Sequence, residues 1–176
     1  GWSPDTEKTS LAIAPVSNTG DWGAQLVSGG QNEVAKMWQD VPVEPFATYQ
    51  PSGWALLNDP SLDEIFFRIT WLDGGGGLIH EDSSWPPLVY SLVAPGTYTY
   101  RSTGAKIAPA DASKARVSGT AFGIGGTFSI YFDDLSFTQV APPPPTPVPT
   151  APPTPPPTAP PTSAPPPTVV ATPAPT

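Results

Sequence analysis

The chain has 176 residues and a net charge of −8, from 15 acidic and 7 basic side chains, and it contains no cysteine. Nucleic acids and anionic membranes attract clusters of basic side chains, so this charge balance argues against both as partners. No apolar run approaches the ~20 residues of a membrane-spanning helix, and without cysteine the fold has no disulfide and no thiolate metal site.

The composition changes at Ala141. All charged and aromatic residues precede this position, whereas residues 142–176 are almost wholly Pro, Thr, Ala, Val and Ser. A segment without large apolar side chains cannot bury enough surface to offset the entropy lost on ordering. The sequence therefore predicts one folded domain, residues 1–141, followed by a Pro/Thr-rich extended tail, residues 142–176.

Short β-rich runs bounded by Gly, Pro, Asn and Asp recur through the first 141 residues. The predicted strands are 10–14, 24–28, 34–41, 54–57, 64–72, 88–93, 97–101, 114–118 and 127–138. In the run 64–72, Ile65, Phe67, Ile69 and Trp71 occupy alternate positions, which is typical of a strand with one buried face. Many short strands without a helical period predict an all-β fold, either a sandwich or a barrel.

The tail carries a regular threonine spacing. The threonines are Thr146, Thr150, Thr154, Thr158, Thr162, Thr168, Thr172 and Thr176, four residues apart except for one slip of two. A polyproline II helix has about three residues per turn, so each threonine points about 120° from the last and the threonines surround the rod. We expect an O-glycosylated polyproline rod, with a plain interdomain linker as the alternative. A linker needs a second domain to connect, so a tail that ends the chain would favour the rod over the linker.

We expect mass spectrometry of tail peptides to show glycan mass on the eight threonines. If each threonine carries a sugar, the rod is coated on all sides. Unmodified threonine throughout the tail would contradict the coated-rod hypothesis.

Catalysis has little support in the sequence. A serine nucleophile needs a neighbouring base, and the only histidine, His80, lies outside any nucleophile motif. Three carboxylate pairs are candidates for glycoside hydrolysis: Asp63/Glu64, Glu81/Asp82 and Asp133/Asp134. We expect the first two pairs to be solvated loop acids, and the sequence predicts a protein that is not an enzyme.

The C-terminal part of the domain carries a family resemblance. Residues 107–117, IAPADASKARV, and 126–137, GTFSIYFDDLSF, resemble the C-terminal half of galactose-binding-like jelly-roll modules, many of which bind carbohydrate. Residues 45–54 and 67–73 are similar to earlier strands of that family. The resemblance implies an antiparallel jelly-roll β-sandwich of about eight strands. It also implies a structural Ca²⁺ bound by Asp133 and Asp134 with an acid from the first strand, and no other cofactor.

The opening strand of that family is not recognisable in this sequence, which begins Gly1-Trp2. A sandwich without its first strand would expose an unpaired edge that accepts a strand from another chain. The tail offers one β-capable segment, at Val169 and Val170. We expect these residues to act as the strand donor in a head-to-tail polymer, with simple linker variation as the alternative.

Tryptophans suggest a second kind of partner. Sugars stack on exposed Trp and Tyr rings beside polar groups that fix their hydroxyls. Trp85, in a loop, is the first candidate for stacking on a polysaccharide, and Trp22 is the next. Trp54 and Trp71 lie in strand patterns, so we expect them in the core.

Two functions follow from these observations. The first is a non-catalytic structural subunit of a glycosylated fibre, secreted and placed outside the cell or on its surface. The alternative is a carbohydrate-binding module attached by a Pro/Thr linker to a secreted enzyme. The tail favours the first function and the family resemblance favours the second.

Overall fold

The computed structural model describes residues 1–4, 9–30, 34–84, 86–142 and 144. By its internal contacts the chain divides into two units, Gly1–Pro145 and Thr146–Thr176. The eight tail threonines and the strand donors Val169 and Val170 lie outside the described residues, and so does Trp85. Among the residues that the structure does describe, no helix is long and apolar enough to cross a lipid bilayer.

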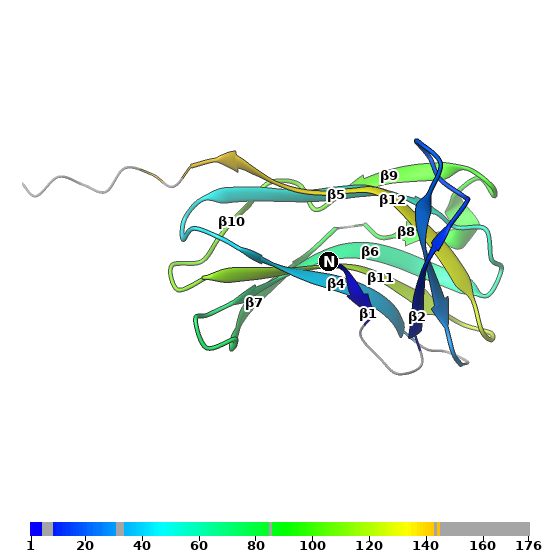
Figure 1. Cartoon of the computed structure of the whole chain (residues 1–176), viewed down its shortest axis with the longest axis horizontal. Coiled ribbons are helices and arrows are strands. Elements are labelled where there is room, and N and C mark those ends of the chain that lie inside the picture. Colours follow the sequence, from blue (N-terminus) through cyan, green and yellow to red (C-terminus); the bar gives the residue numbers. More distant parts are fainter. Residues whose placement is uncertain (5–8, 31–33, 85, 143, 145–176) are drawn as a thin grey trace, which may run out of the picture. The chain divides into compact units, whose positions relative to one another are not determined.

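The first unit contains two antiparallel β-sheets that lie one above the other (Figure 1). The β11 sheet has the order β1 (Ser3–Pro4), β4 (Val34–Pro42), β11 (Lys114–Gly123), β6 (Leu62–Leu72) and β7 (Leu78–Ser83), with β8 (Leu88–Val89) also paired to β6. The β12 sheet has the order β10 (Lys106–Ile107), β5 (Thr48–Leu56), β12 (Ser129–Ala141), β3 (Gly23–Ser28) and β2 (Thr9–Ala14), with β9 (Tyr98–Ser102) also paired to β5. A single 3₁₀ turn, η1 (Tyr90–Leu92), follows β8 within the described part of the chain.

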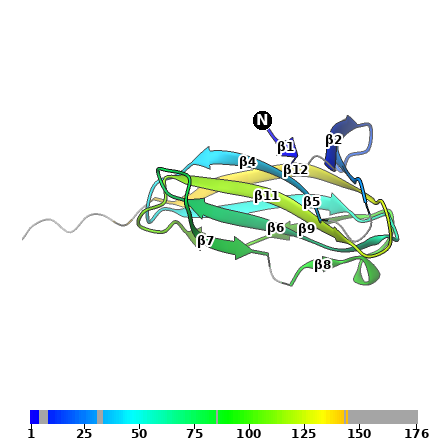
Figure 2. The same ribbon diagram turned by 90° about the horizontal axis from the view of Figure 1, so that it is seen from below.

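The antiparallel sandwich predicted from the sequence is therefore confirmed, and Figure 2 shows β4, β11, β6 and β7 side by side in one layer. The core lies between the layers. Ile65, Phe67, Ile69 and Trp71 of β6 are each at most 2% exposed, as their alternation predicts. On β11, a Cβ at Gly119 would come 3.1 Å from the Phe132 ring, so glycine at this position leaves room for that ring between the sheets.

Three strand predictions were wrong in extent. The predicted strand 114–118 is only the first half of β11, which continues to Gly123. The predicted strand 88–93 is β8 followed by the 3₁₀ turn η1, and the run at 54–57 is only the end of β5, which begins at Thr48. Pro51 and Gly53 concealed the first part of β5, since both residues are usually depleted in strands. In the structure Pro51 pairs with Phe137 of β12, and its carbonyl oxygen accepts the Ser102 hydroxyl at 2.9 Å.

The expectation of a missing first strand was also wrong. β2 pairs with β3 along the edge of the β12 sheet, and β1 pairs with β4 along the edge of the β11 sheet. Both edge positions near the N-terminus are thus occupied without the family's opening motif. Leu11 of β2 packs against the core, although the sequence of this strand differs from the family's pattern.

Candidate functional site

The outer surface of the β12 sheet carries aromatic as well as polar side chains. Along β5, Tyr49 and Ala55 point into the core, so the alternating residue Trp54 points away from it. Trp54 is in register with Tyr100 of β9 on one side and with Asp133 of β12 on the other. These three side chains form one row across the outer surface.

A second row lies one step along the same strands. Leu56 of β5 is in register with Tyr98 of β9 and with Tyr131 of β12, and Tyr131 is in register with Gln25 of β3. Leu56 is 6% exposed and belongs to neither of the two core clusters. We call Trp54, Tyr98, Tyr100 and Tyr131 the aromatic face.

The rings of the aromatic face are partly open to solvent. Tyr100 is 45% exposed, and the other three rings are partly exposed. The centroids of Trp54 and Tyr100 are 5.5 Å apart and the rings meet at 62°, so they do not cover one another as a stacked pair would. Ring surface is therefore left open to solvent on this side of the sheet.

Hydrogen-bonding groups surround the rings. Gln25 Nε2 donates to the Tyr131 hydroxyl at 3.1 Å, which fixes that phenol. Ser52 of β5 pairs with Ser102 on one side and Ser136 on the other, so three hydroxyl side chains follow the aromatic rows. Polar atoms next to apolar rings are the combination that binds the hydroxyls and the C–H surface of a sugar.

Tyr98 is the most constrained member of the aromatic face. Its hydroxyl donates to the Val16 carbonyl oxygen at 3.0 Å. Burial, with smaller contributions from Asp133 and Tyr131, raises the pKa of Tyr98 to about 12. The carboxylate and the two phenols are thus close enough to influence one another, although they come from β9 and β12.

We expect Tyr98 to be the phenol that ionises late when the native protein is titrated with base. Because its folded pKa is raised above the unfolded value, its contribution to stability is present below about pH 10 and is lost as the pH rises towards 12. Tyrosinate absorbance should show a late phase in the native protein that Tyr98→Phe removes. A late phase that survives this substitution would contradict the assignment.

The outer surface of the β11 sheet also has aromatic residues, but guanidinium groups cover their rings. The Arg116 guanidinium lies 3.9 Å from the Trp38 ring centroid and donates to Asp40 from Nε at 2.8 Å and from Nη2 at 3.0 Å. These bonds hold the pKa of Asp40 below its usual value. Arg68 lies 4.9 Å from the Phe66 centroid. Ring surface is consequently less available there than on the aromatic face.

The Asp133–Asp134 pair, predicted to bind Ca²⁺, holds a turn of the backbone. Asp133 Oδ2 accepts the backbone N–H groups of Asn18 at 2.7 Å and Thr19 at 2.9 Å, and its Oδ1 accepts the N–H of Asp134 at 2.9 Å. The Thr19 hydroxyl donates to Asp134 Oδ1 at 2.7 Å. No group of three or more His or acidic side chains that would suit a metal ion occurs among the described residues. The calcium site stays a prediction.

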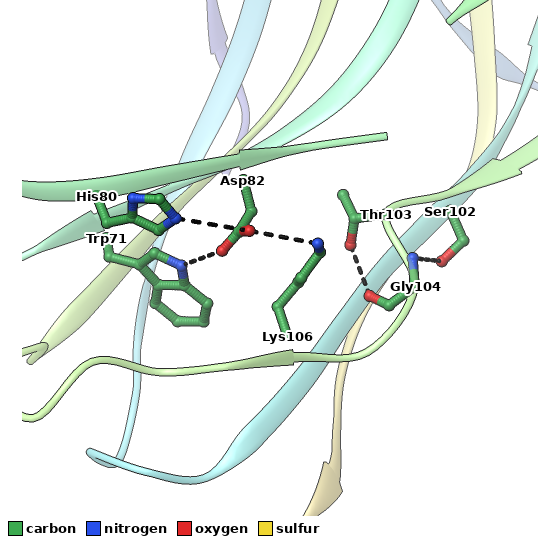
Figure 3. Close-up of polar contacts among 7 residues, drawn as sticks. All are labelled: Trp71, His80, Asp82, Ser102, Thr103, Gly104 and Lys106. Atoms are coloured by element: carbon green, nitrogen blue, oxygen red, sulfur yellow. Dashed lines mark hydrogen bonds and ion pairs between the residues drawn. The ribbon is translucent and has the colours of Figure 1, made fainter. Parts of the chain in front are cut away.

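A second polar cluster lies where the edges of the two sheets approach one another (Figure 3). The carboxylate of Asp82 on β7 accepts the Trp71 indole N–H at 2.8 Å, and its other oxygen lies 3.3 Å from Lys106 Nζ on β10. His80 Nε2 is 3.7 Å from the same oxygen. Asp82 therefore connects a core tryptophan of the β11 sheet to an edge strand of the β12 sheet.

The cluster in Figure 3 lacks the geometry of a nucleophilic site. The Ser102 hydroxyl donates to the Pro51 carbonyl oxygen and the Thr103 hydroxyl donates to the Gly104 carbonyl oxygen, so neither offers its proton to His80. The Trp71 indole bond and the Lys106 ion pair give Asp82 a structural role. The expectation that two of the acid pairs lie in loops was wrong, since Asp63 and Glu64 lie on β6 and Glu81 and Asp82 lie on β7.

Sequence reasoning found part of this site. Trp22 is exposed as expected, at 61%, and Trp71 is buried as expected, but Trp54 is not in the core. Its position in a strand could not show which face of that strand points outward. The functional candidates Tyr98, Tyr100, Tyr131 and Gln25 were missed, although the alternation of Tyr98 and Tyr100 in the sequence TYTYRS was a usable signal.

No protein-family model matches the sequence, and no curated protein matches it. Solved structures do match the fold. The CBM22-1–GH10 modules of the xylanase Xyn10B from Clostridium thermocellum, in complex with xylohexaose, match with a TM-score of 0.64 at 17% identity; the match covers 80% of this chain and 26% of that one. The CBM22-1 xylan-binding domain of Xyn10C from Paenibacillus barcinonensis matches with a TM-score of 0.63 at 14% identity, over 80% of this chain and 86% of that one.

The fold is found in other settings too. The enzymatically active domain of tailspike protein 4 from bacteriophage CBA120 matches with a TM-score of 0.58 at 17% identity, over 79% of this chain and 19% of that one. This chain thus corresponds to about a quarter of the xylanase chain and about a fifth of the tailspike chain. The jelly-roll β-sandwich of carbohydrate-binding modules, expected from the sequence resemblance, is confirmed as the fold.

Proposed function

We propose that this protein is a non-catalytic carbohydrate-binding module that holds a polysaccharide on the aromatic face. The observation that supports it is the joint placement of Trp54, Tyr98, Tyr100 and Tyr131 on one sheet surface, outside the core and beside polar side chains. Jelly-roll structures of similar fold include domains named for xylan binding, which agrees with this proposal.

Each side chain has a distinct role in the proposed complex. Trp54 and Tyr100 provide ring surface for the C–H faces of successive sugar rings. The Tyr131 hydroxyl, fixed by Gln25, presents its oxygen to a sugar hydroxyl. Both carboxylate oxygens of Asp133 accept hydrogen bonds from backbone N–H groups. We therefore assign Asp133 to stabilising the backbone turn and not to binding the ligand.

The ligand class follows from charge. The protein carries −8, and Asp133 lies in the aromatic row, so a polyanionic polysaccharide would be repelled. A neutral, β-linked polysaccharide such as xylan, with ring faces for stacking and hydroxyls for hydrogen bonds, fits the aromatic face. Such a ligand also places the protein outside the cell, where structural polysaccharides occur.

The fibre hypothesis depends on tail residues outside the described part of the chain, so it stays a prediction. A glycosylated tail is compatible with a binding module, for which it would act as a spacer. The two functions differ in what they require of the folded unit. Only the binding module needs the rings of the aromatic face to be open.

A binding screen with the full-length chain tests the proposal. We expect retention in native gels that contain soluble xylan, mixed-linkage β-glucan or galactomannan, or co-sedimentation with insoluble xylan or cellulose. Retention that Trp54→Ala removes would support the aromatic face as the binding site. No retention on any neutral polysaccharide would overturn the proposal.

A further inference from the structure

A depression lies where β12 separates from β3. The two strands are paired from Ser129 to Phe132, after which β12 shifts register and continues along β5. The depression has a volume of ≈ 330 Å³, which is at the small end of the range for small-molecule sites. We call it the Trp22 notch; it is lined by Trp2, Ile13, Trp22, Gly23, Ala24, Phe132, Asp133, Asp134 and Leu135.

One side of the Trp22 notch is apolar and open. Trp22 is 61% exposed and Ile13 is 77% exposed, although both are large apolar side chains. Trp2, which also lines the notch, packs against both core clusters and is thereby held in place. An exposed indole beside a side chain already held by the core can stack on a ligand ring. Binding there costs little side-chain conformational entropy.

The other side of the notch is acidic. Asp134 is exposed, and its Oδ1 accepts the Thr19 hydroxyl at 2.7 Å. Among the described residues its Oδ2 has no hydrogen-bond partner. The backbone of Asp134 has φ +48°, a left-handed conformation that Asp adopts more readily than most residues with a side chain. The notch thus combines an exposed ring with one available carboxylate oxygen.

These features restrict the class of ligand. Two carboxylates repel an anion. A purely apolar ligand would take water from Asp134 without replacing its hydrogen bonds, which is unfavourable. An uncharged ring with one apolar face and hydroxyl donors at its rim satisfies both sides, since it stacks on the indole and donates to the carboxylate.

We infer that the Trp22 notch is a second glycan-binding site, which takes one uncharged sugar ring stacked on Trp22 with a hydroxyl donated to Asp134 Oδ2. The contacts assigned to Trp22, Ile13 and Asp134 do not involve the rings of the aromatic face, although Asp133 lines the notch and is also in register with Trp54. Two sites on one module raise the affinity for a polysaccharide that reaches both, without any new contact at either.

Titration of the isotopically labelled full-length chain tests the inference, with methyl β-xyloside, methyl β-glucoside, xylohexaose and cellohexaose as probes. We expect at least one probe to shift the Trp22 indole N–H signal saturably. Trp22→Ala, which also assigns the signal, and Asp134→Asn should each weaken the binding at least about tenfold. Phe46→Ala is the matched control, because Phe46 is an exposed loop aromatic, at 52%, that does not line the notch.

The outcomes separate the two sites. If a probe shifts the Trp54 signal while none of the four shifts the Trp22 signal, the notch is not a binding site and the aromatic face remains supported. If the Trp22 signal shifts in a Trp54→Ala variant, the notch stands by itself. If Trp22 shifts but Asp134→Asn binds as the native protein does, the proposed carboxylate contact is wrong.

Discussion

Trp54→Ala is expected to weaken binding of the full-length chain to its polysaccharide at least about tenfold, or 1.4 kcal/mol. Trp54 lies at the centre of the aromatic face, between Tyr100 and Asp133, and it provides the largest ring. Aromatic side chains at the centre of a binding surface contribute most of the binding energy. Isothermal titration calorimetry, or mobility in polysaccharide-containing gels, measures the loss.

The matched control for this prediction is Trp38→Ala. Trp38 is a partly exposed tryptophan on the outer surface of the opposite sheet, where Arg116 covers its ring. Its removal should leave glycan affinity within about twofold of the native value, whereas Trp54→Phe should restore part of the affinity lost in Trp54→Ala. Equal losses in Trp38→Ala and Trp54→Ala would place the ligand elsewhere.

Trp71→Ala is expected to destabilise the folded unit by about 3–5 kcal/mol, a large part of the 5–15 kcal/mol typical of a domain. Trp71 is 0% exposed, and it packs against Tyr49 with the ring centroids 6.1 Å apart. Removing the indole also takes the N–H from Asp82, which among the described residues then keeps its contacts with Lys106 and His80. Urea unfolding of the native and variant proteins measures the difference.

Trp71→Phe separates the two contributions to this prediction. Phenylalanine keeps most of the packing but cannot donate to Asp82, so it should cost about 1–3 kcal/mol, from the lost hydrogen bond to a partly buried carboxylate together with a small cavity. Glycan binding should be unchanged in the folded fraction of either variant. A loss below about 1 kcal/mol in Trp71→Ala would mean that this end of the core is not tightly packed.

The sequence by itself determined the fold class and the inner face of the strands. Alternation on β6 predicted that Ile65, Phe67, Ile69 and Trp71 face the core, and the motif around Asp133 predicted the jelly roll. Period-two patterns are local, so they can be read without knowing which strands are neighbours. Strands that break the pattern were missed: β7 follows a glycine run, and its sequence LIHEDS is rich in charge.

Only the tertiary structure decided where the candidate sites lie. Trp54 appeared to be a core residue because its strand is apolar, and register with β9 and β12 was needed to show that it joins Tyr100 and Tyr131 outside the core. Trp22 and Asp134 are 112 positions apart, and they line one notch because β12 leaves β3 beside them. Both sites depend on which strands pair and in what register, and those long-range choices are set by the packing of the whole sandwich.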